Sequence, residues 1–321
     1  MKRLILAFVI SFSVLLLVGS LSACGTANPI ADNSASPSAQ ASKQPANEPL
    51  DIDVELIGED GNDEYYDLEN VTAVIDSPLQ GKTIYWLGSS VTMGAGSRGQ
   101  SIPHFLAKTD GVNCVVEAVP GTTLQTLESG PERSYVSRMK ASTDFDKSAD
   151  IDAFFCQVST NDCTPERFGA LGKITPDNVT DMNEFDLSTA AGAVEYIIAY
   201  VHETWGCPVY FYSGSWFGDP GSGIRSQEDP TGGEHIKQIP TGSNYIKLIE
   251  IVYAAIEKWN KVEGCHVGIV DLFNDDAFNE MVSDAEYEYL MQDSVHPRKA
   301  GYLVWWLPEF QRFLYNELAA N

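Results

Sequence analysis

Short apolar runs alternate along the chain with longer segments in which apolar residues recur every three or four positions. The short runs are almost continuously apolar, which is typical of strands that are covered on both faces of a sheet. They predict five strands, at Thr83–Leu87, Cys114–Val119, Ala153–Val158, Val209–Tyr212 and Val267–Leu272. Strands that alternate with helices form right-handed βαβ units, so we expect an α/β fold with a mostly parallel five-stranded sheet.

The segments with helical periodicity predict the helices between these strands. They are Ile102–Lys108, Ser188–Thr204, Tyr245–Val262 and Arg298–Leu318. Two Gly- and Pro-rich segments, residues 164–187 and 213–243, predict long loops that leave the carboxyl ends of strands. Loops of this length often cover a functional site. Trp216 and Phe217 in the second loop could line a pocket there or could pack the loop itself.

A glycine and two serines follow the first predicted strand. A strand that stops at Gly88 and feeds a helix would place Ser90 at the carboxyl edge of the sheet and at a helix N-terminus. The unpaired N–H groups and positive field at such a terminus suit a hydroxyl that attacks a carbonyl and leaves an oxyanion. A helix N-cap would explain the serine equally well when this stretch is considered alone.

A possible base for Ser90 lies near the end of the chain, in Asp293-Ser294-Val295-His296-Pro297. A serine is a weak nucleophile until a neighbouring base takes its proton, and a carboxylate must orient a histidine base. The three-residue spacing lets Asp293 reach Nδ1 of His296 and leaves Nε2 free to face Ser90. Pro297 suits the first position of the helix that follows.

The oxyanion needs hydrogen-bond donors, and three are expected at adjacent strand ends. They are the N–H of Ser90, the N–H of Gly121 after the second strand, and the side-chain amide of Asn161 after the third. Each motif alone has a structural explanation, since Asn161-Asp162 could cap a turn and Asp293 could cap the last helix. Four motifs in this order at one sheet edge favour acyl-transfer chemistry.

At this point the chain resembles the SGNH (GDSL) hydrolase family from about Gly81 to Leu318. The four family blocks are matched by Gly88-Ser89-Ser90, Gly121, Asn161-Asp162 and Asp293-x-x-His296-Pro297. The resemblance implies a three-layer α/β/α, flavodoxin-like sandwich and hydrolysis of esters, often acyl esters of carbohydrates or lipids. It implies Ser90 as nucleophile, His296 as base, Asp293 as its orienter, and Ser90, Gly121 and Asn161 as the oxyanion hole.

The chain departs from the family pattern at three places. Ser89 stands where the family usually has an acidic residue, and Ser159 stands where it has a glycine two residues before Asn161. The asparagine and glycine that often precede Gly121 are absent. The second departure bears on the backbone beside the oxyanion hole, because serine has fewer backbone conformations than glycine.

The N-terminus has the features of an export signal. Lys2 and Arg3 precede an apolar stretch, Leu4–Val18, and small residues follow. The signal ends at Leu21-Ser22-Ala23-Cys24, which resembles the bacterial lipobox, so we expect a signal peptide over residues 1–23 and lipidation of Cys24. An ordinary signal peptide and an uncleaved membrane anchor are the alternatives, although the apolar run is shorter than the ~20 residues of a typical span.

Composition then divides the rest of the chain. Residues 24–50 have almost no large apolar side chain and predict a disordered tether. Residues 51–80 predict an acidic extension packed on or leading into the domain, and the resemblance implies that residues 81–321 form an SGNH hydrolase domain. The 44% hydrophobic content is enough for one large domain, and the net charge of −25 makes nucleic acid a poor partner.

No metal and no cofactor is expected, because the acidic residues do not follow a calcium-loop pattern and the proposed chemistry needs neither. Five cysteines remain besides Cys24, and a disulfide between Cys207 and Cys265 stays open. The sequence therefore predicts a serine esterase or acyl hydrolase, lipid-anchored outside the cytoplasm of a bacterial cell, that acts on a short acyl ester of a small molecule or carbohydrate. A non-catalytic surface binding lipoprotein and an acyltransferase with the same triad are the alternatives.

Overall fold

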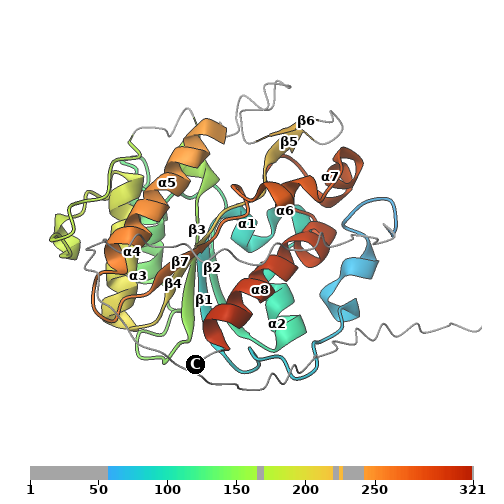
Figure 1. The fold of residues 1–321 in the computed structure, drawn as a ribbon, viewed down its shortest axis with the longest axis horizontal. Helices are drawn as coiled ribbons and strands as arrows, with labels where there is room; N and C mark the ends of the chain where they lie inside the picture. Colours follow the sequence, from blue (N-terminus) through green and yellow to red (C-terminus); the bar gives the residue numbers. More distant parts are fainter. Residues whose placement is uncertain (1–56, 165–169, 220–223, 227–241, 320–321) are drawn as a thin grey trace, which may run out of the picture. The chain divides into compact units, whose positions relative to one another are not determined.

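The computed structural model describes residues 57–164, 170–219, 224–226 and 242–319. At their centre lies a five-stranded sheet in which every neighbouring pair of strands is parallel (Figure 1). The strands are β1 Thr83–Gly88, β2 Asn113–Ala118, β3 Ala153–Gln157, β4 Val209–Tyr212 and β7 Val267–Val270. Their order, β2-β1-β3-β4-β7, is the flavodoxin-like order. The predicted α/β fold is confirmed, with each strand within two residues of its expected bounds.

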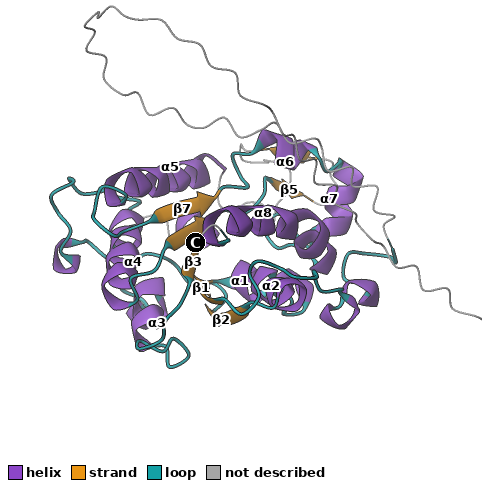
Figure 2. Ribbon diagram, turned by 60° about the horizontal axis from the view of Figure 1, so that its bottom comes forward, coloured by secondary structure: helices purple, strands orange, loops and turns teal. Residues whose placement is uncertain are grey.

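The helices form one layer on each side of this sheet (Figures 1 and 2). Those that cover the two faces are α2 Ile102–Asp110, α3 Tyr135–Ala141, α4 Ala190–Thr204, α5 Gly242–Trp259 and α8 Leu307–Leu318. Helices α3, α4 and α5 cover one face, and α2 and α8 cover the other. Two apolar cores result, one on each face of the sheet.

Alternation along the strands explains why both faces need a core. Tyr85 and Leu87 of β1 are buried in the core under α3 to α5, whereas Ile84 and Trp86 are buried in the core under α2 and α8. Successive side chains of a strand point to opposite faces, so an almost continuous apolar run is buried on both. This pattern is the reason the strands could be predicted from sequence.

The predicted last helix, Arg298–Leu318, is not a single α-helix. Residues Gly301–Trp306 form a π-helical turn, and the α-helix α8 begins only at Leu307. Pro308 gives the physical reason. It has no N–H to bond back to the preceding turn, and its ring crowds the carbonyl four residues earlier, so the helix widens before it.

Several short elements have no counterpart in the sequence prediction. They are α6 Asp276–Glu280, α7 Asp284–Leu290 and an antiparallel pair, β5 Phe217–Asp219 with β6 Ile224–Ser226. Helix α3 was also not predicted. The helix expected to begin at Ser90 is present as the single turn α1, Ser90–Met93. The strand pair lies within the predicted loop 213–243, of which residues 220–223 and 227–241 fall outside the described ranges.

The predicted signal peptide, the tether, Cys24 and residues 51–56 of the acidic extension all lie outside the described residues. None of the helices that the structure describes combines the length and the apolar character needed to cross a bilayer.

Candidate active site

Ser90 lies at the point where the sheet order reverses. Strand β1 has β2 on one side and β3 on the other, and Ser90 is the first residue of the short helix α1 that follows β1. In open parallel sheets this position at the carboxyl ends of the strands is where ligands bind. The N–H of a first helical residue has no acceptor within its own helix, so it remains available to a ligand.

We call residues 88–92 the nucleophile turn. Gly88 is required here because a Cβ on it would lie 1.7 Å from Oγ1 of Thr92. Oε1 of buried Gln157 on β3 accepts hydrogen bonds from the N–H groups of Ser89 (2.9 Å) and Thr92 (3.2 Å) and from the Thr92 hydroxyl (2.8 Å). The turn is thus held by a side chain of the neighbouring strand.

Arg138 of α3 makes a second connection at this edge. Its Nη2 donates to the Gly88 carbonyl at 2.7 Å and to the Thr122 hydroxyl at 3.1 Å, and its Nη1 donates to Glu117 at 2.9 Å. Arg138 is 9% exposed, so these bonds form away from bulk water. Sequence reasoning identified neither Gln157 nor Arg138. A polar residue in an apolar strand was a signal for Gln157, whereas no pattern pointed to Arg138.

We call residues 291–297 the histidine turn. Its ends are joined by an antiparallel bridge between Met291 and Pro297 and by a bond from the Gln292 N–H to the His296 carbonyl at 2.8 Å. Both carboxylate oxygens of Asp293 lie 2.9 Å from Nδ1 of His296, and Nε2 of His296 lies 2.7 Å from Oγ of Ser90. The structure therefore brings the three residues predicted from sequence into one hydrogen-bonded chain.

The hydrogen bonds also determine which nitrogen of His296 carries a proton in the neutral ring. An ionised carboxylate only accepts, so Nδ1 donates to Asp293 and Nε2 is left to accept the hydroxyl proton of Ser90. Burial raises the pKa of Asp293, but hydrogen bonds and charge from His296, together with the N–H groups of Val295 and His296, outweigh it. The pKa of Asp293 consequently lies below its ordinary value, and the group is ionised at neutral pH.

Pro297 does not take the position expected from sequence. It belongs to the bridge with Met291, and the helix begins two residues later, at Lys299. The fixed φ of proline suits an extended position as well as a first helical one. Proline still limits the backbone beside His296, but within the histidine turn rather than within the helix.

The two other predicted oxyanion donors lie on loops that follow β2 and β3. Gly121 has φ +71°, a left-handed conformation that favours glycine. The N–H of Val119 bonds to the Gly88 carbonyl at 3.3 Å, so this loop starts beside the nucleophile turn. Nδ2 of Asn161 donates to the Thr122 carbonyl at 2.9 Å. An amide has two hydrogens, so this bond leaves the second one for a substrate.

Asp162, next to Asn161, is hydrogen-bonded to the backbone of the loop that carries Gly121. It is fully buried, and its carboxylate accepts the N–H groups of Leu124 at 2.8 Å and Gln125 at 3.0 Å. Burial raises its pKa to about 6 despite these bonds.

Ser159 stands where the family that the sequence resembles has a glycine. Its φ is −76°, a conformation open to any residue. The backbone beside Asn161 therefore accommodates serine without strain.

The structure shows the contacts of the aromatic and cysteine residues for which the sequence left alternatives open. Phe217 is buried between Tyr245 and Phe273, with ring centroids 5.3 Å and 5.0 Å away, and so packs the loop. Half-buried Trp216 donates its indole N–H to the Phe273 carbonyl at 2.9 Å.

Cys207 and Cys265 are both free thiols, so the structure has no disulfide between them. In the described part of the chain, no cluster of three or more His, Cys, Asp or Glu side chains could hold a metal ion.

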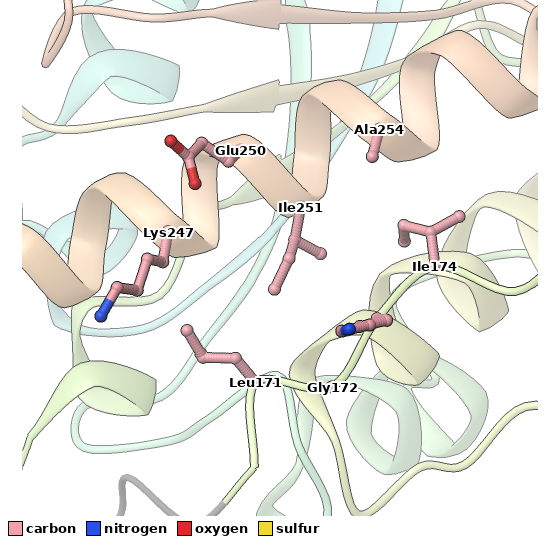
Figure 3. Close-up of a pocket in the computed structure, with 8 residues that line it drawn as sticks. Leu171, Gly172, Ile174, Lys247, Glu250, Ile251 and Ala254 are labelled. Carbon is pink, nitrogen blue, oxygen red and sulfur yellow. The ribbon is translucent and has the colours of Figure 1, made fainter.

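A hollow of about 520 Å³ lies between α5 and the segment 171–174 (Figure 3). Its lining is mostly apolar and consists of Leu171, Gly172, Lys173, Ile174, Lys247, Glu250, Ile251 and Ala254. None of the residues predicted for catalysis lines this hollow. The candidate chemistry belongs to the carboxyl edge of the sheet instead.

Comparisons with known proteins show the fold. No protein-family model matches the sequence. No curated protein matches it either. A crystal structure of a Lactobacillus plantarum protein has a TM-score of 0.50 and 20% identity, with 74% of this chain and 98% of that chain covered. Another crystal structure has a TM-score of 0.52 and 18% identity, with 75% and 99% covered.

A third structure, the native aryl esterase of M. smegmatis, has a TM-score of 0.49 and 12% identity, with 74% of this chain and 100% of that chain covered. Identities this low carry no functional argument, and the two structures with TM-scores of 0.50 and 0.52 show a common fold alone. The predicted α/β fold with its parallel five-stranded sheet is thus confirmed.

Proposed function

We propose that this chain is a serine esterase of the SGNH type that cleaves a short acyl ester through an acyl-enzyme. The observation that carries the proposal is the continuous contact from Asp293 through His296 to Ser90, with Nε2 of His296 2.7 Å from the hydroxyl oxygen. A hydroxyl that donates to an oriented imidazole is what nucleophilic catalysis by serine requires.

In the first half of the reaction, Nε2 of His296 takes the Ser90 proton while Oγ attacks the ester carbonyl. The oxyanion accepts hydrogen bonds from the N–H groups of Ser90 and Gly121 and from the Asn161 amide. His296 then gives its proton to the leaving alcohol, and the acyl group remains on Ser90. Asp293 stays ionised and stabilises the imidazolium.

In the second half, His296 takes a proton from water as the water oxygen attacks the acyl-enzyme. The bond between the acyl carbon and Oγ of Ser90 then breaks, and His296 returns the proton to Oγ, which releases the acid and free Ser90. The substrate we propose is an acetyl or other short acyl ester, carried by a small molecule or a carbohydrate. The expected surface location favours a carbohydrate ester. Apart from the attacking water, the chemistry uses side chains and backbone N–H groups of this chain.

The test is hydrolysis of p-nitrophenyl esters from acetate to octanoate by the full-length chain, beside labelling of Ser90 by a fluorophosphonate. We expect turnover of the shortest esters and a single label on Ser90. The Ser90→Ala variant should lose both, by a factor of ~10⁴ or more in kcat. Labelling at another residue, or equal turnover by Ser90→Ala, would overturn the proposal. Binding of an ester without turnover or labelling would favour the binding lipoprotein.

An acyltransferase would use the same three residues and differ only in the acceptor. Addition of a sugar to the esterase assay distinguishes the two. Transfer of the acyl group to the sugar at the expense of free acid would indicate a transferase, whereas release of free acid alone agrees with the proposed hydrolase.

We further propose that the enzyme is anchored by lipid on Cys24 and works outside the cytoplasm. The support is the sequence of the signal, from Lys2 and Arg3 to Ala23 and Cys24. Cys24→Ala should move the protein from the membrane fraction to the soluble fraction and remove incorporation of labelled palmitate. Membrane retention with unchanged labelling would contradict the anchor.

A further inference from the structure

The acidic segment before the predicted domain bonds to the residues that flank the histidine turn. We call residues 57–70 the N-terminal brace. The N–H of Gly61 bonds to the Tyr289 carbonyl at 3.1 Å, and the Gly61 carbonyl accepts the N–H of Ala300 at 2.9 Å. The two bonded positions lie on either side of the histidine turn along the chain. The brace therefore holds both ends of the segment that carries Asp293 and His296.

Asn62 extends this contact to the chain that follows the nucleophile. Its side chain is buried, with the residue 7% exposed. Its Oδ1 accepts the N–H of Lys299 at 3.2 Å, and its Nδ2 donates to the carbonyl of Gly96 at 2.9 Å. A backbone N–H only donates and a carbonyl only accepts, so the orientation of the amide is unambiguous. One side chain thus joins the segment after His296 to the segment after Ser90.

Gly96 is also where these two segments touch. A Cβ on Gly96 would lie 2.9 Å from Cβ of His296 and 2.7 Å from the Pro297 carbonyl oxygen. The backbone of the loop after Ser90 therefore packs directly on the histidine turn. A small change at the Gly96 carbonyl would alter the separation of His296 and Ser90, because no gap separates the two segments there.

Charged groups of the brace and of the segment after Pro297 form pairs around Asn62. Lys299 is buried, and its ammonium group donates to the Asn62 carbonyl at 3.1 Å and to the Asp67 carboxylate. The hydrogen bond from Lys299 holds the pKa of Asp67 below its ordinary value. Arg298 and Asp60 form a further pair at 3.2 Å. Both cations directly after Pro297 are thus paired with carboxylates of the brace.

We propose that Asn62 is a positioning residue of the esterase, which fixes the distance between His296 and Ser90 by bonding to the segments that follow both. This role rests on the proposed function of Ser90 and His296. Proton transfer depends on the reacting atoms being held within a fraction of an ångström of their productive geometry, and a displacement of 1 Å can cost ~100-fold in rate. Asn62 acts on the rate of the chemical step rather than on substrate binding.

Asn62→Asp is the informative variant. It keeps the acceptor for the Lys299 N–H and places its added charge near the Lys299 ammonium, so the chain should remain folded. It replaces the Nδ2 donor by an oxygen that faces the Gly96 carbonyl, which pushes the two segments apart. We expect kcat and the rate of fluorophosphonate labelling of Ser90 to fall ~10- to 100-fold, with KM within ~2-fold of the wild type.

The matched control is Asn70→Asp, which makes the same chemical change in the same segment. Nδ2 of Asn70 donates to the Glu64 carbonyl at 2.7 Å, within the brace. We expect wild-type kcat and labelling. Asn62→Ala serves as a second variant without the added charge, and its kcat should fall to a similar extent.

The outcomes separate this inference from the proposed function. Wild-type kcat and labelling in folded Asn62→Asp would overturn the positioning role and leave the esterase intact. A lower melting temperature with unchanged kcat would show a purely structural role and would also overturn it. Failure of the wild type to label at Ser90 would overturn the proposed function, and the role of Asn62 with it.

Discussion

The two turns that meet in the candidate active site are held by different means. The nucleophile turn, residues 88–92, is fixed from within the fold, by Gln157 of the neighbouring strand and by Arg138 of a packed helix. The histidine turn, residues 291–297, is closed by its own backbone and held from outside by the N-terminal brace. One turn depends on the sheet and its core, whereas the other depends on a segment more than 200 residues earlier in the chain.

This difference predicts two kinds of failure. A change in the nucleophile turn disturbs buried groups of the sheet edge, so it should lower the free energy of unfolding. A change at Asp293 or His296 of the histidine turn affects partly exposed side chains, so it should lower activity and leave the free energy of unfolding nearly unchanged. Three of the following predictions each test one side of this comparison, and the prediction for Asp162 tests the Gly121 loop beside the nucleophile turn.

The largest effect is expected for Asp293→Asn on the histidine side. Its amide N–H₂ would donate to Nδ1 of His296 and leave the proton on Nε2, which then cannot accept the Ser90 proton. We expect kcat to fall ~10³- to 10⁴-fold. The Asp293 side chain is 48% exposed, so urea unfolding should shift little. Wild-type kcat would show that another group orients His296.

On the nucleophile side, Gly88→Ala would place a Cβ 2.5 Å from Cβ of Thr92. Gly88 and Thr92 are both buried, so the backbone of the turn must move to make room for the added Cβ. We expect a loss of about 3 kcal/mol in unfolding free energy, measured by urea denaturation. Gly130→Ala is the control, because its Cβ would have its nearest neighbour, Arg133, at 3.5 Å. Equal stability of the two variants would contradict the tight fit at Gly88.

A pH effect of intermediate size is expected from Asp162. Its pKa is raised by burial to about 6, above the ordinary 3.8, so the folded state binds its proton more tightly than the unfolded state. The resulting stability is present at low pH and is lost as pH rises through 6. Between pH 4.5 and 7 the wild type should lose about 2 kcal/mol relative to Asp162→Asn. Parallel pH profiles of the two proteins would refute this assignment.

The smallest effect is expected for Asp60→Asn in the brace. The Asp60–Arg298 pair has side-chain exposures of 47% and 16%. Such a pair contributes less than about 1 kcal/mol, and asparagine keeps the oxygen that accepts the Asn62 N–H. Unfolding free energy and kcat should both stay close to the wild-type values. A loss of 2 kcal/mol would show that the surface charges, rather than Asn62, hold the brace.

The strands could be predicted because burial on both faces leaves a continuous apolar run in the sequence. Helix α3 could not, because its seven residues, Tyr135–Ala141, include Ser137, Arg138 and Lys140 and too few turns to show a period. The meeting of Ser90 with His296 was predicted because short motifs at strand ends converge on one edge of a parallel sheet.

The supports of the two turns were not predictable in the same way. Asn62 acts through tertiary contacts with partners 34 and 237 residues away in the sequence. Arg138 acts through contacts with partners 16 and 50 residues away. No local spacing encodes such contacts. The shift of Pro297 from a helix to a bridge likewise depends on Met291, whose pairing is a property of the folded turn.

The bond between Asn62 and Lys299 also bears on the order in which the protein becomes active. A ribosome makes residue 62 well before residue 299, and the bond between them spans 237 positions. Closing so long a loop is unfavourable until the intervening elements have folded. The brace therefore stays unpaired until the segment around Lys299 has been made. A nascent chain that lacks this segment cannot hold His296 against Ser90, so the proposed esterase activity would begin only after that segment has folded against the brace.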